Sequence, residues 1–446
     1  MFVKQMTSCV VYARSLQGVI GIKECNVPIG EKIKQVREIK NVSQEMLGME
    51  IGCSRAGVYQ LESGKQSCSS SVQWEIKRAL GVEGLPFTEF ERKSFRDKLY
   101  FCNKLIDEGN FIEAKDGLEK LSVIVFLPCD WELNALYNLF YIRLLLKLND
   151  VEAATAILTD LNQLAPEFDN ELNHFYYFNK GTVCSKSGNY KDALDCYLKS
   201  RDFMKGGFEE NQWLFYNIAY CLSKLSYVFS TIVFIENGYP FQAAEQHTLT
   251  SFALEHILAK NYLVAGHVKK AKKLLANCLE KAKSKDDKML ISLILVDFGH
   301  LYRINQDWCT AVEYIEDALN YLQKGSVSYL EALYQKVRCH IGMGNFPVCK
   351  TLLQEGHELS QSNKIYAVLF EALDHLMTLN DDKSMSYIED VAIPLLLEVS
   401  AKTTALDYCK ILQKHYSKKG TLKKQLSIEK IVAGIYEDML EGGVIE

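Results

Sequence analysis

The pattern of apolar and polar positions repeats with a long period after about residue 100. A six-residue segment recurs, with a small or polar residue first, an apolar or aromatic residue third and a small residue, most often alanine, last. The segments are "GNFIEA" (109–114), "NDVEAA" (149–154), "GNYKDA" (188–193), "SYVFST" (226–231), "GHVKKA" (266–271), "QDWCTA" (306–311) and "GNFPVC" (344–349). Their first positions lie 38–40 residues apart. A period this regular predicts a solenoid of stacked helix pairs.

A second register of the same period lies seven residues before each segment, and most of its members are small. They are Cys102, Ile142, Gly181, Ala219, Ala259, Gly299 and Val337. Small residues let two antiparallel helices approach closely, so each segment is predicted to be the turn between a first helix A and a second helix B. Two further helical segments, 383–400 and 402–440, are predicted to extend or cap the array.

The region before the repeats has a shorter helical pattern. Residues 29–40 place apolar side chains on one face, and Ser43 then opens a second helix as its N-cap. The inward positions of this second helix are predicted to be Met46, Leu47 and Ile51. Gly52 follows, where a sharp corner calls for a residue that tolerates positive φ, and Ser54 caps the next helix. Two short helices joined by a glycine turn predict a helix-turn-helix.

The stretch "SQEMLGMEIGCSRAGVYQLESGK" within residues 29–82 resembles the lambda-repressor-like helix-turn-helix family. The resemblance implies that Gln44 contacts DNA phosphate and that Arg55, Ala56 and Gln60 face the bases. Arginine can bond a guanine edge and glutamine an adenine edge, while Ser54, Tyr59 and Lys65 are placed to hold the DNA backbone. Gly57, inside the second helix, departs from the family pattern. The alternative is a head that has lost DNA contact and serves as a docking surface.

In a solenoid of this kind, the A helices line a concave groove. Positions nine and six residues before each turn share one face of helix A. The position ten residues before the turn adds aromatic side chains at several levels. The candidate peptide-binding residues are Arg143, Asn179, Tyr216, Asn217, Tyr220, Lys260, Asp297, His300, Gln335 and Arg338. Asparagine is unfavourable inside helices, and its amide suits the main chain of an extended peptide. The alternatives are that Asn179 and Asn217 bond neighbouring helices, and that Asp297 pairs with Arg338 or Lys260.

Composition narrows the function further. Only 7 prolines interrupt 446 residues, which favours an all-α protein. The net charge of −5 divides into about +4 for residues 1–82 and −9 for the rest, so nucleic-acid contact is expected at the head. The 14 cysteines lack metal-ligand spacing, and no nucleophile, metal or phosphate-binding motif occurs. We therefore expect reduced thiols, no cofactor, no enzymatic activity, no membrane span and a cytoplasmic location.

The repeated segments resemble tetratricopeptide repeats. Together with the helix-turn-helix, they resemble the RNPP family of peptide-responsive regulators. The resemblance implies an all-α fold with a right-handed superhelical solenoid, a short signalling peptide in the groove, and a homodimer on a DNA operator, with a tetramer as the alternative. The expected organisation is a flexible extension (1–28), the DNA-binding head (29–82), a linker and hinge (83–93) and the repeat domain (94–440). The competing hypothesis is an adaptor, like the related Rap proteins, that binds a response regulator or another protein instead of acting through DNA.

Overall fold

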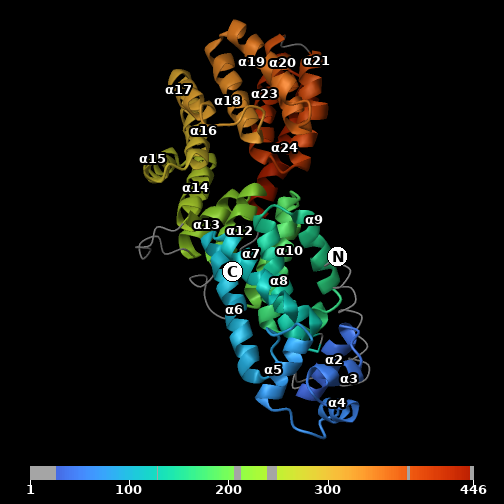
Figure 1. Ribbon diagram of the computed structural model, residues 1–446. Coiled ribbons are helices and arrows are strands. Elements are labelled where there is room, and N and C mark those ends of the chain that lie inside the picture. Colours follow the sequence, from blue (N-terminus) through green and yellow to red (C-terminus); the bar gives the residue numbers. More distant parts are fainter. Residues whose placement is uncertain (1–26, 128, 205–211, 239–248, 379–381, 442–446) are drawn as a thin grey trace. The chain divides into compact units, whose positions relative to one another are not determined.

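The computed structural model describes residues 27–127, 129–204, 212–238, 249–378 and 382–441. Nearly all of the expected extension, residues 1–28, lies outside the described residues. Every regular element within the described residues is helical (Figure 1). The predicted all-α fold, a helix-turn-helix followed by a helical repeat solenoid, is confirmed. The chain divides into two compact units, Met1–Gly207 and Phe208–Glu446.

The head opens the first unit with four short helices. They are α2 (Ile29–Ile39), α3 (Gln44–Glu50), α4 (Arg55–Glu62) and α5 (Ser70–Ala79). Ser43 and Ser54 cap α3 and α4 as predicted, each accepting a bond from a backbone N–H three residues on. Leu47 is buried, whereas Met46 is 56% exposed, so the prediction that Met46 faces inward is wrong. A seven-residue helix packed on one side has room for few inward side chains, and Leu47 fills that role.

The rest of the first unit consists of three helix pairs and two short 3₁₀ segments. The elements are α6 (Glu89–Glu108), α7 (Phe111–Leu121), η1 (Ser122–Phe126), α8 (Trp131–Lys147), α9 (Val151–Leu161), η2 (Ala165–Glu167), α10 (Asn170–Lys186) and α11 (Tyr190–Asp202). One core of buried apolar side chains runs without interruption from Ile33 in α2 to Tyr176 in α10. The head and the first repeats therefore share a hydrophobic core.

The segment expected to be a hinge, residues 83–93, is tightly packed. Leu85 and Phe87 are each 1% exposed. The Glu91 carboxylate accepts from the backbone N–H of Phe87 and Thr88 and pairs with Lys77 of α5 at 2.5 Å. These bonds tie the segment to the head on one side and to α6 on the other.

The head also contacts η1 and the loop that follows it. Gln35 Oε1 accepts from the backbone N–H of Cys129 (3.2 Å), and Lys32 Nζ donates to the Phe87 carbonyl (3.0 Å). The Lys40 ammonium lies 3.9 Å from the centre of the Phe126 ring. Because Lys32 and Gln35 are buried, these contacts fix α2 against the body of the unit.

The second unit continues the helix pairs and ends in an irregular cap. Its elements are α12 (Gln212–Lys224), α13 (Val228–Gly238), α14 (Leu249–Val264), α15 (Val268–Ser284), α16 (Lys288–Ile304), α17 (Trp308–Leu319), α18 (Val327–Met343), α19 (Phe346–Leu359), α20 (Lys364–Thr378), α21 (Asp382–Tyr387), η4 (Ile388–Ala392, a π-helical turn), α22 (Ile393–Glu398), α23 (Lys402–Lys419) and α24 (Leu422–Glu441). The single helix expected over 402–440 is two helices, because Gly420 takes φ +68° and ends α23.

All seven turns predicted from the repeat are present between an A helix and a B helix. The first residue of each segment has positive φ, including three that are not glycine: Asn149 (65°), Ser226 (59°) and Gln306 (61°). The backbone N–H of the next residue in each turn donates to the carbonyl five positions earlier, as Asn189 does to Cys184. This is the hydrogen-bond pattern that closes a helix through a left-handed residue.

The small residues before each turn and the last residue of each six-residue segment pack between helices as expected. The last residue of every segment is fully buried at 0% exposure. A Cβ added at Gly299 of α16 would lie 2.4 Å from Ile315 Cγ1 of α17, and one at Gly181 of α10 would lie 2.8 Å from the Tyr197 ring of α11. Small residues therefore set the close approach of A and B helices at these levels.

The second unit also brings its first and last elements together. Ser226 Oγ donates to the Ser400 carbonyl (3.0 Å), and the Lys402 ammonium lies 5.0 Å from the centre of the Tyr227 ring. Helices α13 and α24 are in contact. The end of the unit is thus fastened to its beginning.

Candidate functional site

Helix α4 presents a polar, accessible face. Val58 and Leu61 point into the core at 1% and 5% exposure. Of the residues predicted to face DNA, all but half-buried Gln44 are exposed: Ser54, Arg55, Ala56, Tyr59, Gln60 and Lys65. The Lys65 ammonium lies 5.6 Å from the centre of the Tyr59 ring. The exposed row has the residue types and the helical placement that major-groove contact requires.

A buried ion pair holds α4 against α2. Arg37 donates from Nε to Glu62 Oε1 (2.5 Å) and from Nη2 to Oε2 (3.1 Å). The hydrogen bond to Glu62 raises the pKa of Arg37 despite burial. Gln44 Nε2 donates to the same Glu62 oxygen (2.7 Å). Half-buried Gln44, at the start of α3, is therefore oriented by Glu62 rather than free in solvent.

Two glycines shape the turn and the start of α4. Gly52 has φ +68°, which confirms the positive φ predicted at the corner. A Cβ at Gly57 would lie 2.3 Å from Cys53 Sγ. The departure from the family pattern at Gly57 therefore has a local cause, since the Cys53 side chain fills the space that a larger residue would need.

In the first unit, two of the predicted peptide-binding residues are engaged by the protein itself. Arg143 bonds Asn103 and also pairs with Asp107 at 2.7 Å. Asn179 is fully buried and donates to the Leu139 carbonyl of α8 (2.9 Å), while its Oδ1 has no partner among the described residues. For Asn179, this is the interhelical bond considered as the alternative.

In the second unit, α12 carries a row of half-buried aromatic side chains. Tyr216 and Tyr220 stack at 5.9 Å, and Trp213 meets Tyr216 edge-on at 6.0 Å. Burial raises the pKa of Tyr216 to about 12. Asn217 is half-buried beside them, and no hydrogen bond of its amide is found among the described residues. Its donor and acceptor are therefore open to a ligand.

Charges of α14 and α16 meet at the next level. His256 Nε2 lies 2.6 Å from Asp297 Oδ2. Burial opposes ionisation of Asp297, but the Lys260 ammonium and His256 hold its pKa below the ordinary value. The Asp297 carboxylate in turn raises the pKa of Lys260, which remains solvent-exposed. The alternative pairing of Asp297 with Lys260 is thus supported, with His256 as the direct partner.

At the level of α18, Glu331 organises the neighbouring polar groups. It accepts from Gln335 Nε2 (2.8 Å) and from the Tyr366 hydroxyl of α20 (2.7 Å). Gln335 is 6% exposed, and its Oε1 has no partner among the described residues. Within the described residues, one acceptor of this buried amide thus remains without a hydrogen bond.

The cations of α16 and α18 converge on helix α23. Arg338 Nη2 donates to Asp407 Oδ2 (2.7 Å), and Arg303 Nη2 lies 3.6 Å from the same oxygen. Burial, with Arg303 nearby, lowers the pKa of His300 to about 3, so its ring is neutral at neutral pH. The Tyr334 hydroxyl donates to Tyr408 (3.1 Å).

The structure thus joins most predicted residues of the second unit into one polar surface and adds members that the sequence analysis did not select. The added members are Arg303, Glu331, Tyr366, Asp407 and Tyr408. Arg303 follows His300 by three positions and Glu331 precedes Gln335 by four, so helical spacing could have found both. Asp407 lies 69 residues from Arg338, and no local signal connects them.

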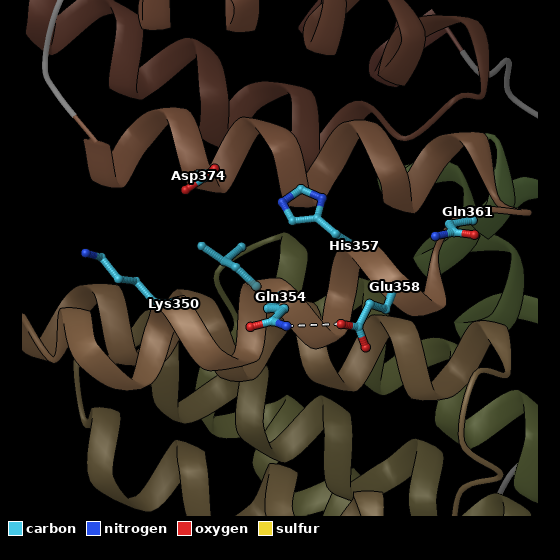
Figure 2. Close-up of a pocket in the computed structure, with 7 residues that line it drawn as sticks. Lys350, Gln354, His357, Glu358, Gln361 and Asp374 are labelled. Atoms are coloured by element: carbon cyan, nitrogen blue, oxygen red, sulfur yellow. Dashed lines mark hydrogen bonds between the residues drawn. The ribbon is translucent and has the colours of Figure 1, made fainter.

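A separate open cleft of about 460 Å³ lies between α19 and α20. Figure 2 shows Lys350, Gln354 and His357 reaching into it from α19 and Asp374 from α20. Gln354 Nε2 donates to Glu358 Oε1 (3.1 Å) along α19. None of the predicted peptide-binding residues lines this cleft.

Comparison with known proteins agrees with this architecture. A family described as "Helix-turn-helix" matches residues 33–85. The transcriptional activator NprA of Geobacillus stearothermophilus is 21% identical over 376 residues, covering 81% of this chain and 92% of NprA. A solved structure of NprR in complex with its cognate peptide NprX matches with TM-score 0.64 at 20% identity, covering 77% of this chain and 99% of NprR. A Rap protein complexed with Competence and Sporulation Factor matches with TM-score 0.67 at 15% identity, covering 79% and 100%.

The fold and the head thus define a helix-turn-helix protein with a tetratricopeptide-like body. The helix-turn-helix match, the similarity to NprA and the fold shared with NprR agree with the resemblance to the RNPP family. Among the described helices, none combines the length and hydropathy needed to cross a lipid bilayer.

Proposed function

We propose that the protein is a peptide-responsive transcriptional regulator. The head reads a DNA operator through α4, and the polar surface of the second unit binds a short signalling peptide. The protein acts in the cytoplasm as a homodimer, because a single helix-turn-helix reads few base pairs and two-fold operators need two heads. This function involves no enzymatic activity or cofactor.

The exposed row on α4 is the observation that carries the DNA-reading part. Arg55 and Gln60 are accessible on a helix whose opposite face is fixed by Val58, Leu61 and the Arg37 pair. A rigid support matters because base contacts are specific only when their side chains are held in register with the groove. Gln44 and Lys65 lie at opposite ends of the helix-turn-helix, where contacts to phosphates would orient the head.

The second unit supports the peptide-binding part. Asn217, Tyr216 and Tyr220 offer an open amide beside aromatic rings, while Lys260 offers an accessible cation. Gln335 has a buried oxygen without a partner in the described part of the chain, which an N–H of a ligand would satisfy. The NprR structure that was solved in complex with its cognate peptide NprX shares this fold. Asp297, His300 and Arg338 form the charged part of the same surface.

The shared core of the first unit supports coupling between the two activities. Since Gln35, Lys32 and Glu91 tie the head to the body, a change in the arrangement of the repeats moves the head with them. A ligand shifts such an equilibrium only by the difference in its affinity for the two arrangements.

DNA binding is tested by selecting sequences from a random duplex pool with the full chain. The double substitution Arg55→Ala and Gln60→Ala should reduce binding to the selected sequence by about 30-fold or more, because each bidentate base contact contributes about 1–3 kcal/mol. Lys104→Ala removes an exposed positive charge of α6 and should leave specific binding within a few-fold of the wild type. Equal losses of DNA affinity in the two variants would show that the head binds DNA only through non-specific charge attraction.

The alternative is an adaptor that binds a response regulator or another protein. The observation that favours it is the shared fold with a Rap protein over 79% of the chain. Pull-down with purified response regulators discriminates the two hypotheses. A stable complex that survives Arg55→Ala, together with absence of sequence-selective DNA binding, would support the adaptor.

A further inference from the structure

Side chains from α16, α18 and α23 converge on a single carboxylate oxygen. Asp407 Oδ2 lies 2.7 Å from Arg338 Nη2 and 3.6 Å from Arg303 Nη2. The exposed fractions are 15% for Arg338, 11% for Arg303 and 30% for Asp407. Two largely buried guanidinium groups therefore share one carboxylate, which comes from a helix outside the repeat pairs.

This arrangement leaves hydrogen-bonding capacity unused. Arg303 Nε is buried and has no partner among the described residues, and the 3.6 Å contact of its Nη2 is longer than a hydrogen bond. His300 supplies no negative charge to balance them, because burial lowers its pKa to about 3 and its ring is neutral. A buried cationic donor without an acceptor is unfavourable, and a planar guanidinium matches a second carboxylate in geometry.

The neighbouring acids are already engaged. Asp297 pairs with His256, and Glu331 accepts from Gln335 and Tyr366. None of these hydrogen bonds and ion pairs of Asp297 and Glu331 involves Arg303. The acceptor that would complete the site must therefore come from outside this group of side chains.

We propose that Arg303 and Arg338 form a carboxylate-binding subsite, and that Asp407 occupies it until a ligand carboxylate replaces it. The inference rests on the proposed peptide-binding function, and it identifies the ligand as an oligopeptide with a free terminal carboxylate or an acidic side chain. Replacement of Asp407 removes an ion pair that joins α23 to α18. Since α23 begins at Lys402, which contacts Tyr227 at the start of the unit, the exchange loosens the fastening between the two ends.

The test uses full-length protein and mixed pools of short synthetic peptides. The first pool has free C-termini and no Asp or Glu, the second has amidated C-termini and contains Asp or Glu, and the third has amidated C-termini and no acidic residue. Immobilised wild-type protein is compared with Asp407→Asn, which keeps the side-chain shape and removes the competing charge. The matched control is Asp438→Asn, which removes the carboxylate of a surface pair with Lys402 (3.6 Å, Asp438 62% exposed). Retained peptides are quantified by mass spectrometry.

Asp407→Asn should retain about tenfold more of one or both acid-bearing pools than the wild type, because the ligand no longer competes with an internal carboxylate. The pool that gains identifies the source, a terminal carboxylate or an acidic side chain. Retention of the fully neutral pool should stay unchanged, and Asp438→Asn should behave like the wild type. Adding Arg338→Gln to Asp407→Asn should abolish the gain.

Two outcomes separate this inference from the proposed function. Peptides retained equally from all three pools by the wild type and by Asp407→Asn would overturn the carboxylate subsite while leaving peptide binding in place. Retention of no pool by any variant, with circular dichroism showing folded protein, would overturn peptide binding itself.

Discussion

The buried pair of Arg37 and Glu62 should dominate the stability of the head. The Glu62 side chain is 4% exposed and accepts three hydrogen bonds, two from Arg37 and one from Gln44. Substitution Glu62→Gln keeps the shape but leaves the guanidinium of Arg37 without its counter-charge. Breaking a buried pair in this way costs about 3–5 kcal/mol. The lower end, about 3 kcal/mol, applies because the amide retains one acceptor oxygen.

Hydrogen exchange measured by mass spectrometry on the full chain reads this change locally. About 3 kcal/mol corresponds to roughly 100-fold faster exchange of the protected amides of α2 and α4, since each 1.4 kcal/mol is about tenfold. Exchange in α16, in the other unit, should not change. The measurement needs no assumption of two-state unfolding, which a chain of two units does not satisfy.

Glu38→Gln is the matched control, because it removes the other carboxylate near Arg37. Glu38 is 42% exposed and lies 3.7 Å from Arg37 Nη2. An exposed pair contributes about 0–1 kcal/mol, so exchange should increase by less than about fivefold. Similar effects of the two substitutions would refute the argument that burial makes Glu62 the essential partner.

Two further predictions concern the second unit. Gly299→Ala should destabilise it by about 1–3 kcal/mol, because the new methyl would lie 2.4 Å from Ile315. The control Gly434→Ala, in open space on α24, should be neutral or stabilising by up to about 1 kcal/mol. Thermal unfolding of both variants checks the difference, and equal shifts of the unfolding midpoint would contradict it. The pKa of His300 is about 3 in the folded protein against an ordinary 6.5. Below about pH 6.5 the unfolded chain therefore binds a proton that the folded chain does not, so stability falls as pH decreases toward 3, by up to about 2 kcal/mol at pH 5 and less where solvent screens the ring. His300→Gln should bring the thermal midpoints at pH 7 and pH 5 closer together, and an unchanged difference would count against this account.

The local features of the fold were predictable because they depend on local chemistry. The turns at Asn149, Ser226 and Gln306 follow from position in the repeat, although none of the three is glycine. A left-handed residue that closes a helix needs only the backbone bonds of its own turn. The same holds for the caps at Ser43 and Ser54, which involve residues three positions apart.

The partners of the candidate site were less predictable, because they come from distant helices. The spacing of Arg338 placed it on the correct face, but Asp407 reaches it from α23, which no repeat period anticipates. Asn179 has the composition of a ligand-binding residue, yet it lies against the Leu139 carbonyl of the preceding A helix. Helical periodicity assigns a residue to a face, and only the packing of neighbouring helices determines which groups on that face remain accessible.

The packed connection between head and body was also hidden from the sequence. Glycines and a proline near residues 81–86 are typical of a hinge. Leu85 and Phe87 instead enter the common core, because the apolar side chains that flank the breakers find a buried environment between α5 and α6. The head is therefore a continuation of the first unit rather than a tethered module.

The affinity of the full chain for its selected DNA, measured by fluorescence anisotropy with and without a saturating peptide recovered from the pools, tests the central claim most directly. Coupling between two sites is commonly about 1–3 kcal/mol, so the dissociation constant for DNA should change by about fivefold or more. Asn217→Ala should weaken peptide binding. The control Asn320→Ala, at an exposed amide at the end of α17, should leave peptide binding unchanged. An identical dissociation constant for DNA at saturating peptide would contradict the claim that the repeats and the head act as one regulator.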